Sequence, residues 1–296
     1  MPTIQSRPAA RTATTSTAAS TPAKKPATTT SQATVTAPGG WKAPVAPALP
    51  KFIGARFSIE QAGGLMAPKG MKLTSKTEKH TDTVKLTGGK TAKLEWTNQT
   101  LTVKNAAGKT VTLKSPPPQA YAEAQKEFRS AFKGLTKDEL EFEPLTWEKQ
   151  HSYGGFGAAG KMVSVRDYFG EYTGGAHPNG FTFLTTFNTE TGKPVKLSEL
   201  LSKPQIAAIA AALVKEQPKM KSEDGIDATM FAFDDVSTKS MTDFIDRSFA
   251  LTTDSKGNPQ IEIAWESGMY ALGGTMARFT FAAPNDPAFR AKIGLK

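Results

Sequence analysis

The sequence predicts an α+β fold, in which an antiparallel sheet carries helices on one side and follows a small all-β meander and a disordered N-terminal tail. Residues 1–50 are mainly Thr, Ala, Ser and Pro, with almost no large apolar residue before Trp41. Such a segment cannot bury enough surface to offset the entropy that ordering costs. Alternating apolar and polar residues then predict strands over 51–115, and apolar stripes at helical spacing begin after residue 120.

Three consecutive prolines, Pro116–Pro118, separate these two patterns. Proline fixes a backbone torsion and has no amide hydrogen, so the run forms a stiff break. We therefore predict a disordered leader at residues 1–50, a small basic β module at 51–115 and an α+β domain at 119–296.

The β module is expected to be a meander with one apolar face. Turn-forming pairs such as Asn98-Gln99 separate short runs in which every second residue is apolar. Lysines and threonines take the alternate positions and face away. The apolar side needs a cover, either a neighbouring domain or Phe52–Ile59 folding across it. Its members are Val84, Leu86, Leu94, Trp96, Leu101, Val103, Val111 and Leu113.

Charge is distributed unevenly along the chain. Residues 1–115 hold 17 Lys and Arg against 4 Asp and Glu, whereas residues 116–296 hold 20 against 23. A basic segment of this kind favours an anionic partner such as teichoic acid, lipopolysaccharide or nucleic acid, although a solvated lysine-rich surface gives the same composition. Nucleic acid is disfavoured because the single aromatic residue of the strand pattern, Trp96, is in phase with the core positions.

The C-terminal part is expected to alternate helices and strands. An apolar stripe that starts at Tyr121 predicts a helix ended by Gly134, and Thr136 and Glu139 have the spacing of a capping box. Candidate strands at Trp147–Tyr153 and Met162–Phe169 are joined by a flexible hairpin loop at Gly154–Gly160. Later elements are expected at Phe181–Phe187, Pro204–Pro218, Met241–Ile245, Phe249–Trp265 and Ala277–Phe281.

The sequence contains no cysteine, so neither disulfides nor thiolate metal sites are available. No apolar run approaches the roughly 20 residues that span a bilayer. The N-terminus lacks the apolar stretch of a secretory signal. We expect no cofactor.

A glycine-rich loop at Gly170–Gly180 is the most distinctive stretch of the sequence, because it places a histidine among aromatic residues. The pattern Val163–Asn179, followed by Phe187-Asn188, Gly192-Lys193 and Leu197–Leu201, resembles the C-terminal domain of unknown function shared by the lysozyme-sensing anti-sigma factor RsiV and the polysaccharide deacetylase PdaC. The resemblance extends over roughly Leu145–Phe281. Glu266, Tyr270 and Ala271 match a later loop of that family, where Met269 replaces the family's proline.

The Gly170–Gly180 loop and the later loop together supply the candidate site residues. A histidine can act as acid, base or metal ligand, or can tie a loop to a neighbouring strand through its ring nitrogens. We predict that His177 contacts a ligand together with four further side chains, namely Tyr172, Asn179, Glu266 and Tyr270. Aromatic residues, histidine and asparagine on a rigid loop suit recognition of a saccharide or a protein.

Three catalytic alternatives have less support in the sequence. A zinc site at His177 would need carboxylates such as Asp167, Glu171 and Glu266 nearby. A serine triad lacks a Gly-x-Ser-x-Gly elbow, and Ser164 lies inside a predicted strand. The acid pairs Asp234-Asp235 and Asp243/Asp246 fit helix capping better than glycoside hydrolysis.

The resemblance therefore implies a non-catalytic binding domain that works outside the cytoplasm, in an extracellular or periplasmic location, on a lysozyme-like hydrolase or cell-wall glycan. Residues 1–115 would hold it near an anionic polymer. A cell-wall-directed hydrolase that uses His177 and a secreted effector with an export leader are the alternatives. Neither anti-sigma activity nor deacetylation is implied, because the sequence shows no match to the parts that carry them.

Overall fold

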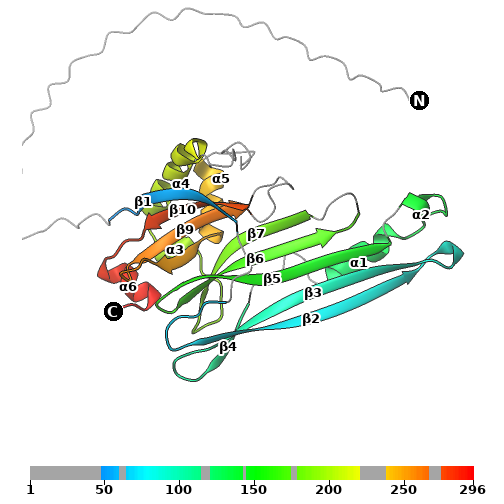
Figure 1. Ribbon diagram of the computed structural model, residues 1–296, viewed down its shortest axis with the longest axis horizontal. Coiled ribbons are helices and arrows are strands. Elements are labelled where there is room, and N and C mark those ends of the chain that lie inside the picture. Colours follow the sequence, from blue (N-terminus) through cyan, green and yellow to red (C-terminus); the bar gives the residue numbers. More distant parts are fainter. Residues whose placement is uncertain are drawn as a thin grey trace, which may run out of the picture. The chain divides into compact units, whose positions relative to one another are not determined.

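The computed structural model describes residues 48–59, 65–114, 121–142, 145–174, 179–220, 238–266 and 275–296. They belong to one compact unit, residues 46–296. The predicted tail lies outside the described residues except for 48–50, as do Pro116–Pro118, His177 and Tyr270. The mixture of sheets and helices confirms the predicted α+β class (Figure 1).

The smaller sheet in the described part has four antiparallel strands in the order β1-β10-β9-β8. Their bounds are Lys51–Ile59 for β1, Ala250–Thr253 for β8, Pro259–Glu266 for β9 and Thr275–Ala282 for β10. The hairpin predicted over Phe249–Trp265 and the last strand are thereby confirmed. Strand β1 pairs along β10, from Lys51 opposite Ala282 to Ile59 opposite Thr275.

The larger sheet has the order β2-β3-β5-β6-β7, and β4 pairs with β3. Its pairs are antiparallel except for β3 and β5, which run parallel over Lys93–Asn98 and Thr146–His151. A parallel pair needs a long crossover, and here β4, α1 and α2 lie between the two strands in sequence. The bounds are Lys72–Lys85 for β2, Thr91–Lys104 for β3, Thr110–Leu113 for β4, Thr146–Ala159 for β5, Met162–Tyr172 for β6 and Asn179–Asn188 for β7.

The helices bury their apolar faces against the two sheets. They are α1 (Tyr121–Ala131), α2 (Glu139–Phe142), α3 (Leu197–Leu200), α4 (Lys203–Glu216), α5 (Thr238–Arg247) and α6 (Pro287–Ile293), with 3-10 turns η1 (Thr87–Gly89) and η2 (Gln217–Lys219). The largest buried cluster joins residues of α3 to α6 to the smaller sheet, for example Leu213 and Phe279. The predicted helices at Tyr121, Pro204 and Met241 are confirmed, whereas α6 was not predicted.

Strand β3 buries opposite faces in its two halves. Leu94 and Trp96 belong to a cluster with Phe128 of α1, whereas Leu101 and Val103 belong to a different cluster with Val163 and other residues. Positions 94 and 101 differ by an odd number and no bulge lies between them, so their side chains leave opposite faces. The cover over Leu94 and Trp96 is therefore the helix α1.

Three sequence expectations were wrong in detail. Asn98-Gln99 is no turn but lies within β3, and Gly154–Ala159 continues β5 with a register shift between Gly155 and Gly157. Phe52–Ile59 does not fold across the meander, because these residues pair with β10 in the other sheet. Strands from residues 51–114 therefore share both sheets with strands from the C-terminal part; the division of the chain into domains stays a prediction.

A candidate binding pocket on the larger sheet

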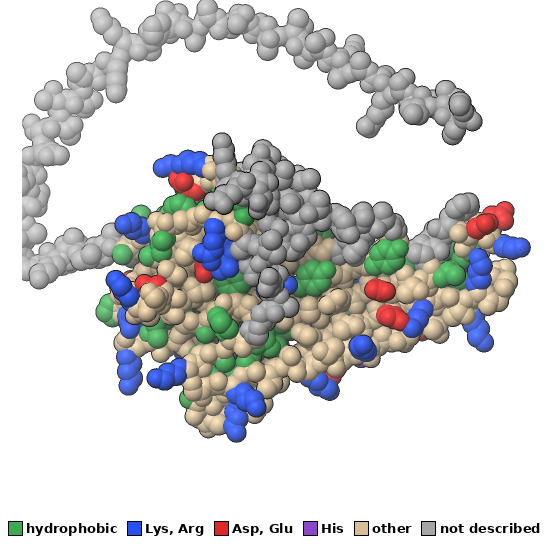
Figure 2. All heavy atoms as spheres, in the orientation of Figure 1, with side chains coloured by type: hydrophobic (Ala, Val, Ile, Leu, Met, Phe, Trp, Pro, Cys, Tyr) green, Lys and Arg blue, Asp and Glu red, His purple; other side chains and the backbone are tan. Residues whose placement is uncertain are grey.

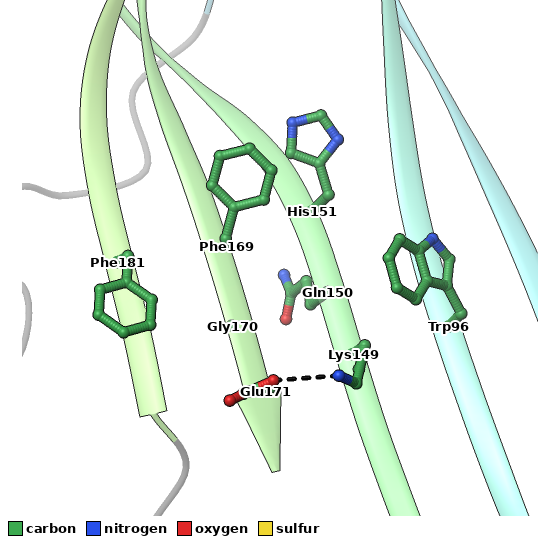
Figure 3. Close-up of a pocket in the computed structure, with 8 residues that line it drawn as sticks. All are labelled: Trp96, Lys149, Gln150, His151, Phe169, Gly170, Glu171 and Phe181. Carbon is green, nitrogen blue, oxygen red and sulfur yellow. Dashed lines mark hydrogen bonds and ion pairs between the residues drawn. The ribbon is translucent and has the colours of Figure 1, made fainter. Parts of the chain in front are cut away.

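A pocket of about 210 Å³ lies on one face of the larger sheet, across β3, β5, β6 and β7 (Figure 3). Register explains why its side chains meet. Lys149 of β5 lies opposite Trp96 of β3 and Glu171 of β6, while Phe169 lies between His151 and Phe181. The lining residues are Trp96, Lys149, Gln150, His151, Phe169, Gly170, Glu171 and Phe181.

Lys149 links the pocket to helix α1. Its Nζ donates to Glu127 Oε2 of α1 at 2.8 Å and to Glu171 Oε2 at 3.1 Å. The lysine side chain is 4% exposed, while the two glutamates are 48% and 36% exposed. A buried ammonium is tolerated only with such partners, because removing an unpaired charge from water costs several kcal/mol.

His151 is held from both sides of its ring. Nδ1 lies 2.6 Å from Asn98 Oδ1, and Nε2 lies 2.7 Å from Asp167 Oδ1. His151 and Asp167 are each 2% exposed, and Thr185 Oγ1 donates to the second oxygen of the aspartate. The ring stacks on Phe169, with centroids 4.6 Å apart and planes 9° from parallel. Both nitrogens are thus engaged, so the imidazole supports the pocket floor and is not presented to a substrate.

Aromatic side chains form the exposed rim. Phe181 is 60% exposed and Phe183 is 37% exposed, although both belong to a strand whose apolar residues are otherwise buried. Phe183 lies at the edge of Phe169, with centroids 6.3 Å apart. Exposed aromatic residues beside a buried polar network are typical of a contact surface for a ligand or partner.

The sequence contained a signal for this site that our prediction missed. Strand β5 places Trp147, Lys149, His151 and Tyr153 on one face, and the exposed residues Glu148 and Gln150 on the other. A lysine and a histidine therefore occupy inward positions of a strand, where apolar residues are expected. Charged residues are almost never buried without partners, so this pattern indicates a polar site on the inward face.

The predicted site residues are only partly described. Tyr172 ends β6 and pairs with Glu148, so by alternation it lies on the sheet face opposite to Glu171 and the pocket. Asn179 starts β7 opposite Glu171, and Glu266 ends β9 opposite Met276. Their side chains lie outside what the structure describes, as do His177 and Tyr270. The ligand-contact role of these five residues stays a prediction.

Two glycines of the predicted loop are strand residues. Gly170 and Gly180 face each other in β6 and β7. A Cβ atom at Gly170 would lie 2.6 Å from the Tyr168 hydroxyl, and one at Gly180 would lie 2.9 Å from the same ring. The glycines are needed here because the Tyr168 ring covers both positions, whereas Gly174 is the loop glycine of the described part that has a positive φ, of 121°.

Two residues considered for catalysis, Ser164 and Asp246, have structural hydrogen-bond partners. Ser164 is buried in β6, and its hydroxyl lies 2.8 Å from Thr186 Oγ1 and accepts from the Leu251 amide. Asp246 accepts from the Ser198 amide at the start of α3, which fits the capping interpretation. Asp234-Asp235 lies outside the described residues. Within the described ranges, no group of three or more His, Asp or Glu side chains could hold a metal ion.

None of the helices in the described part of the chain combines the length and apolar character that crossing a membrane requires.

No protein-family model and no curated protein matches the sequence. Among solved structures, a DUF3298 family member from Bacteroides fragilis is 14% identical, with a TM-score of 0.38 over 73% of this chain and 91% of its own. A second one, from Pseudomonas aeruginosa, is 14% identical with a TM-score of 0.29, covering 49% of this chain and 66% of its own. Both of these solved structures are DUF3298 family proteins, members of a family of domains of unknown function.

Proposed function

We propose that this chain is a non-catalytic recognition domain, and that the pocket on the larger sheet is its contact site. The observation that carries the proposal is the rim of exposed Phe181 and Phe183 over a floor where Lys149 and His151 already have polar partners. A catalytic base must reach the substrate proton that it abstracts. Both ring nitrogens of His151 are instead engaged in hydrogen bonds with Asn98 and Asp167.

For the ligand, we propose a lysozyme-like hydrolase, with cell-wall glycan as the second candidate, in an extracellular or periplasmic setting. The resemblance to the RsiV and PdaC domain supports this choice. The exposed aromatic pair supports a protein partner, because aromatic residues anchor protein interfaces. They also fit the face of a sugar ring, so the two candidates need a direct comparison.

A binding experiment with the full chain tests the proposal. Immobilised protein is exposed to lysozyme and, separately, to peptidoglycan, at physiological salt. We expect lysozyme to be retained and Phe181→Ala to weaken retention by about tenfold or more, as for a central aromatic anchor. Ile53→Ala is the matched control, because Ile53 is 53% exposed on the other sheet. Retention of neither ligand, or equal losses in both variants, contradicts the proposal.

The two alternatives of the sequence have separate tests. If the chain were a cell-wall hydrolase, it would release soluble fragments from peptidoglycan, and His177→Ala would abolish the release. If residues 1–50 were an export leader, their deletion would change the location of the protein in the cell.

Exposed lysines between residues 69 and 114 support a second contact, with an anionic polymer. Lysines 69, 72, 79, 85, 90, 104, 109 and 114 are all exposed and have no ion pair among the described residues, and Figure 2 shows basic side chains along the rim formed by β2 and β4. Lys72 and Lys104 lie directly opposite each other, a like-charge pair that destabilises a sheet. We propose that an anionic polymer offsets this repulsion.

Salt dependence tests the polymer contact. Binding to an anionic cell-wall polymer should weaken steeply with salt, and the Lys72→Gln/Lys104→Gln double variant should show a shallower slope by about two charges. Lys203→Gln/Lys256→Gln removes the same charge elsewhere and should leave the slope unchanged. Equal effects of the two pairs would indicate attraction by net charge alone.

A further inference from the structure

We infer that the pocket on the larger sheet receives a cationic group, namely the guanidinium or ammonium of an arginine or lysine side chain on a protein partner. The inference deepens the proposed function and rests on it for the choice of a protein partner. Its basis is the combination of an incompletely used carboxylate, aromatic side chains and limited volume.

Acidic side chains lie at the floor of the pocket. Two carboxylates, Glu127 and Glu171, both contact the ammonium of Lys149. The neighbouring His151 is held by Asn98 and Asp167. A carboxylate that is only partly engaged, as that of Glu171 is, favours a cation over a neutral or anionic group, and partial removal from water strengthens the preference.

Glu171 presents this charge towards the pocket. Only its Oε2 contacts Lys149, at 3.1 Å, and its side chain is 36% exposed. In Figure 3 the other carboxylate oxygen points away from Lys149, towards the side of the pocket where Phe181 lies. That oxygen has no partner among the described residues, so it can accept a hydrogen bond from a guanidinium or ammonium.

Aromatic side chains complete the site. Phe169, Phe181 and Trp96 line the same pocket as Glu171. A cation over an aromatic face within about 6 Å of the ring centroid is attracted by the ring quadrupole. Phe181 is 60% exposed, so a side chain from a partner can stack on it while its charged end reaches Glu171.

The size of the pocket favours one side chain over a larger ligand. Its volume of about 210 Å³ lies below the range of about 300–1,000 Å³ that is typical for small-molecule sites. An extended arginine or lysine can place its apolar stem against Phe181, in a pocket that Phe169 and Trp96 also line. The side chain of Lys149 is 4% exposed and its ammonium is already held by two carboxylates, so it offers little to an anionic ligand.

Small probes test the inference with the full-length protein. N-acetyl-arginine amide carries only the guanidinium charge, and N-acetyl-citrulline amide is its neutral isostere. We expect the arginine probe, at millimolar concentration, to shift the amide NMR signals of Gly170 and Phe181 in a saturable way, and the citrulline probe to bind about fivefold more weakly or not at all. An oligosaccharide of N-acetylglucosamine serves as the saccharide arm.

Variants connect the response to the named residues. Glu171→Gln removes the charge but keeps the shape, and it should lower the arginine affinity by about fivefold or more. Phe181→Ala, which retains the carboxylate, should weaken it as well. Glu190→Gln is the control, because Glu190 is an exposed glutamate paired with Lys161 in a different place. NMR spectra of each free variant show whether the fold is retained.

The outcomes separate this inference from the proposed function. Equal responses to arginine and citrulline, an unchanged affinity in Glu171→Gln, or a response to the saccharide alone would overturn the inference. If the arginine probe binds as expected and lysozyme does not, the inference stands and the proposed partner fails. If lysozyme binds and Glu171→Gln has no effect on either ligand, the proposed function stands and the cation pocket fails.

Discussion

His151 occupies a core position on β5 that an apolar residue would normally fill. Its imidazole is 2% exposed and lies between an amide oxygen and a carboxylate. The arrangement fixes the ring against Phe169 and thereby sets the position of the pocket floor. Removing either partner would leave the other polar group buried without its hydrogen bond.

Substitution of this histidine should therefore be costly, and the cost should depend on Asp167. We expect His151→Leu to lower the free energy of unfolding by about 3 kcal/mol, because the carboxylate of Asp167 loses its main partner. In the His151→Leu/Asp167→Asn double variant the loss should be smaller than the sum of the two single losses. Urea unfolding measures all four proteins; strictly additive losses would show that the pair does not act as a unit.

Asp82 of β2 anchors helix α1 in a similar pairwise manner. Its two carboxylate oxygens accept from Arg129 Nε at 2.7 Å and Nη2 at 2.8 Å. The hydrogen bonds from Arg129 hold the pKa of Asp82 below its ordinary value of 3.8, opposed by partial burial. The unfolded chain thus binds a proton at a higher pH than the folded protein does, so the pair stabilises the fold above the ordinary value and loses this effect as the pH falls through the lowered pKa.

Arg129→Gln should make stability less sensitive to acid. We expect the wild-type protein to be more stable than the variant near pH 6 and the difference to shrink as the pH falls through the lowered pKa of Asp82, below which the carboxyl group is protonated in both. Urea midpoints collected across this range provide the measurement. A difference that stays constant with pH would mean that Arg129 acts through packing alone.

At the scale of elements, the tight turn between β5 and β6 depends on the C-terminal helix. Gly160 has φ of 57°, and a Cβ atom there would lie 2.1 Å from the carbonyl oxygen of Ile293 at the end of α6. The neighbouring Lys161 amide donates to that same oxygen at 2.8 Å. The glycine thus serves both the backbone conformation of the turn and its close approach to α6.

Gly160→Ala should accordingly destabilise the protein more than a glycine substitution that only strains the backbone. Gly257 provides the comparison, because it has φ of 81° and nothing within 4 Å of its would-be Cβ. We expect Gly257→Ala to cost about 1 kcal/mol, as positive φ alone does, and Gly160→Ala to cost clearly more. Thermal unfolding of the two variants checks the order, and equal losses would exclude a role for the α6 contact.

The accuracy of the sequence predictions also varied by element. Helix α4 and the β8–β9 hairpin were predictable because their signals are local: Pro204 near a helix start, and a turn of Asp254–Asn258 between alternating runs. The parallel pairing of β3 with β5 was not predictable, because the two strands are distant in sequence and no local residue pattern indicates such a pairing. Glycine was also misleading. Gly154 and Gly170 suggested loops, whereas both are paired across β5 and β6, Gly154 with Arg166 and Gly170 with Gln150.

The candidate site was missed for a related reason. The glycine-rich stretch indicated His177 as a ligand contact. The pocket instead depends on residues of four strands that only the sheet order brings together. The inward phase of Lys149 and His151 was visible in the sequence. Their partners Glu127 and Asn98 were not, because each lies more than 20 residues away along the chain.

At the scale of the whole molecule, β1 protects the smaller sheet. It covers the edge of β10, and its Phe52 and Phe57 pack on the main buried cluster. An uncovered edge with apolar neighbours is a template for pairing with another chain. Strand β1 is itself the outermost strand of this sheet, so its protective effect comes from covering the apolar surface under Phe52 and Phe57 as well as the edge of β10.

Truncation tests this role. A chain that begins at residue 46 keeps β1 and should have the oligomeric state and the unfolding midpoint of the full chain. A chain that begins at residue 65 lacks β1 and should self-associate and lose stability, because the edge of β10 and the surface under Phe52 become exposed. Light scattering after size-exclusion chromatography and urea unfolding provide the readouts; a stable monomer without β1 would contradict the expectation.

The pairing of β1 with β10 also has a consequence for how the protein is made. On the ribosome, the strand at Lys51–Ile59 emerges well before its hydrogen-bonding neighbour at Thr275–Ala282, because most of the described chain lies between the two strands. The nascent chain must keep this aromatic strand from premature association throughout translation. Completion of the smaller sheet is therefore expected to wait until β10 has been synthesised, which makes it a late and slow step compared with formation of the local hairpins.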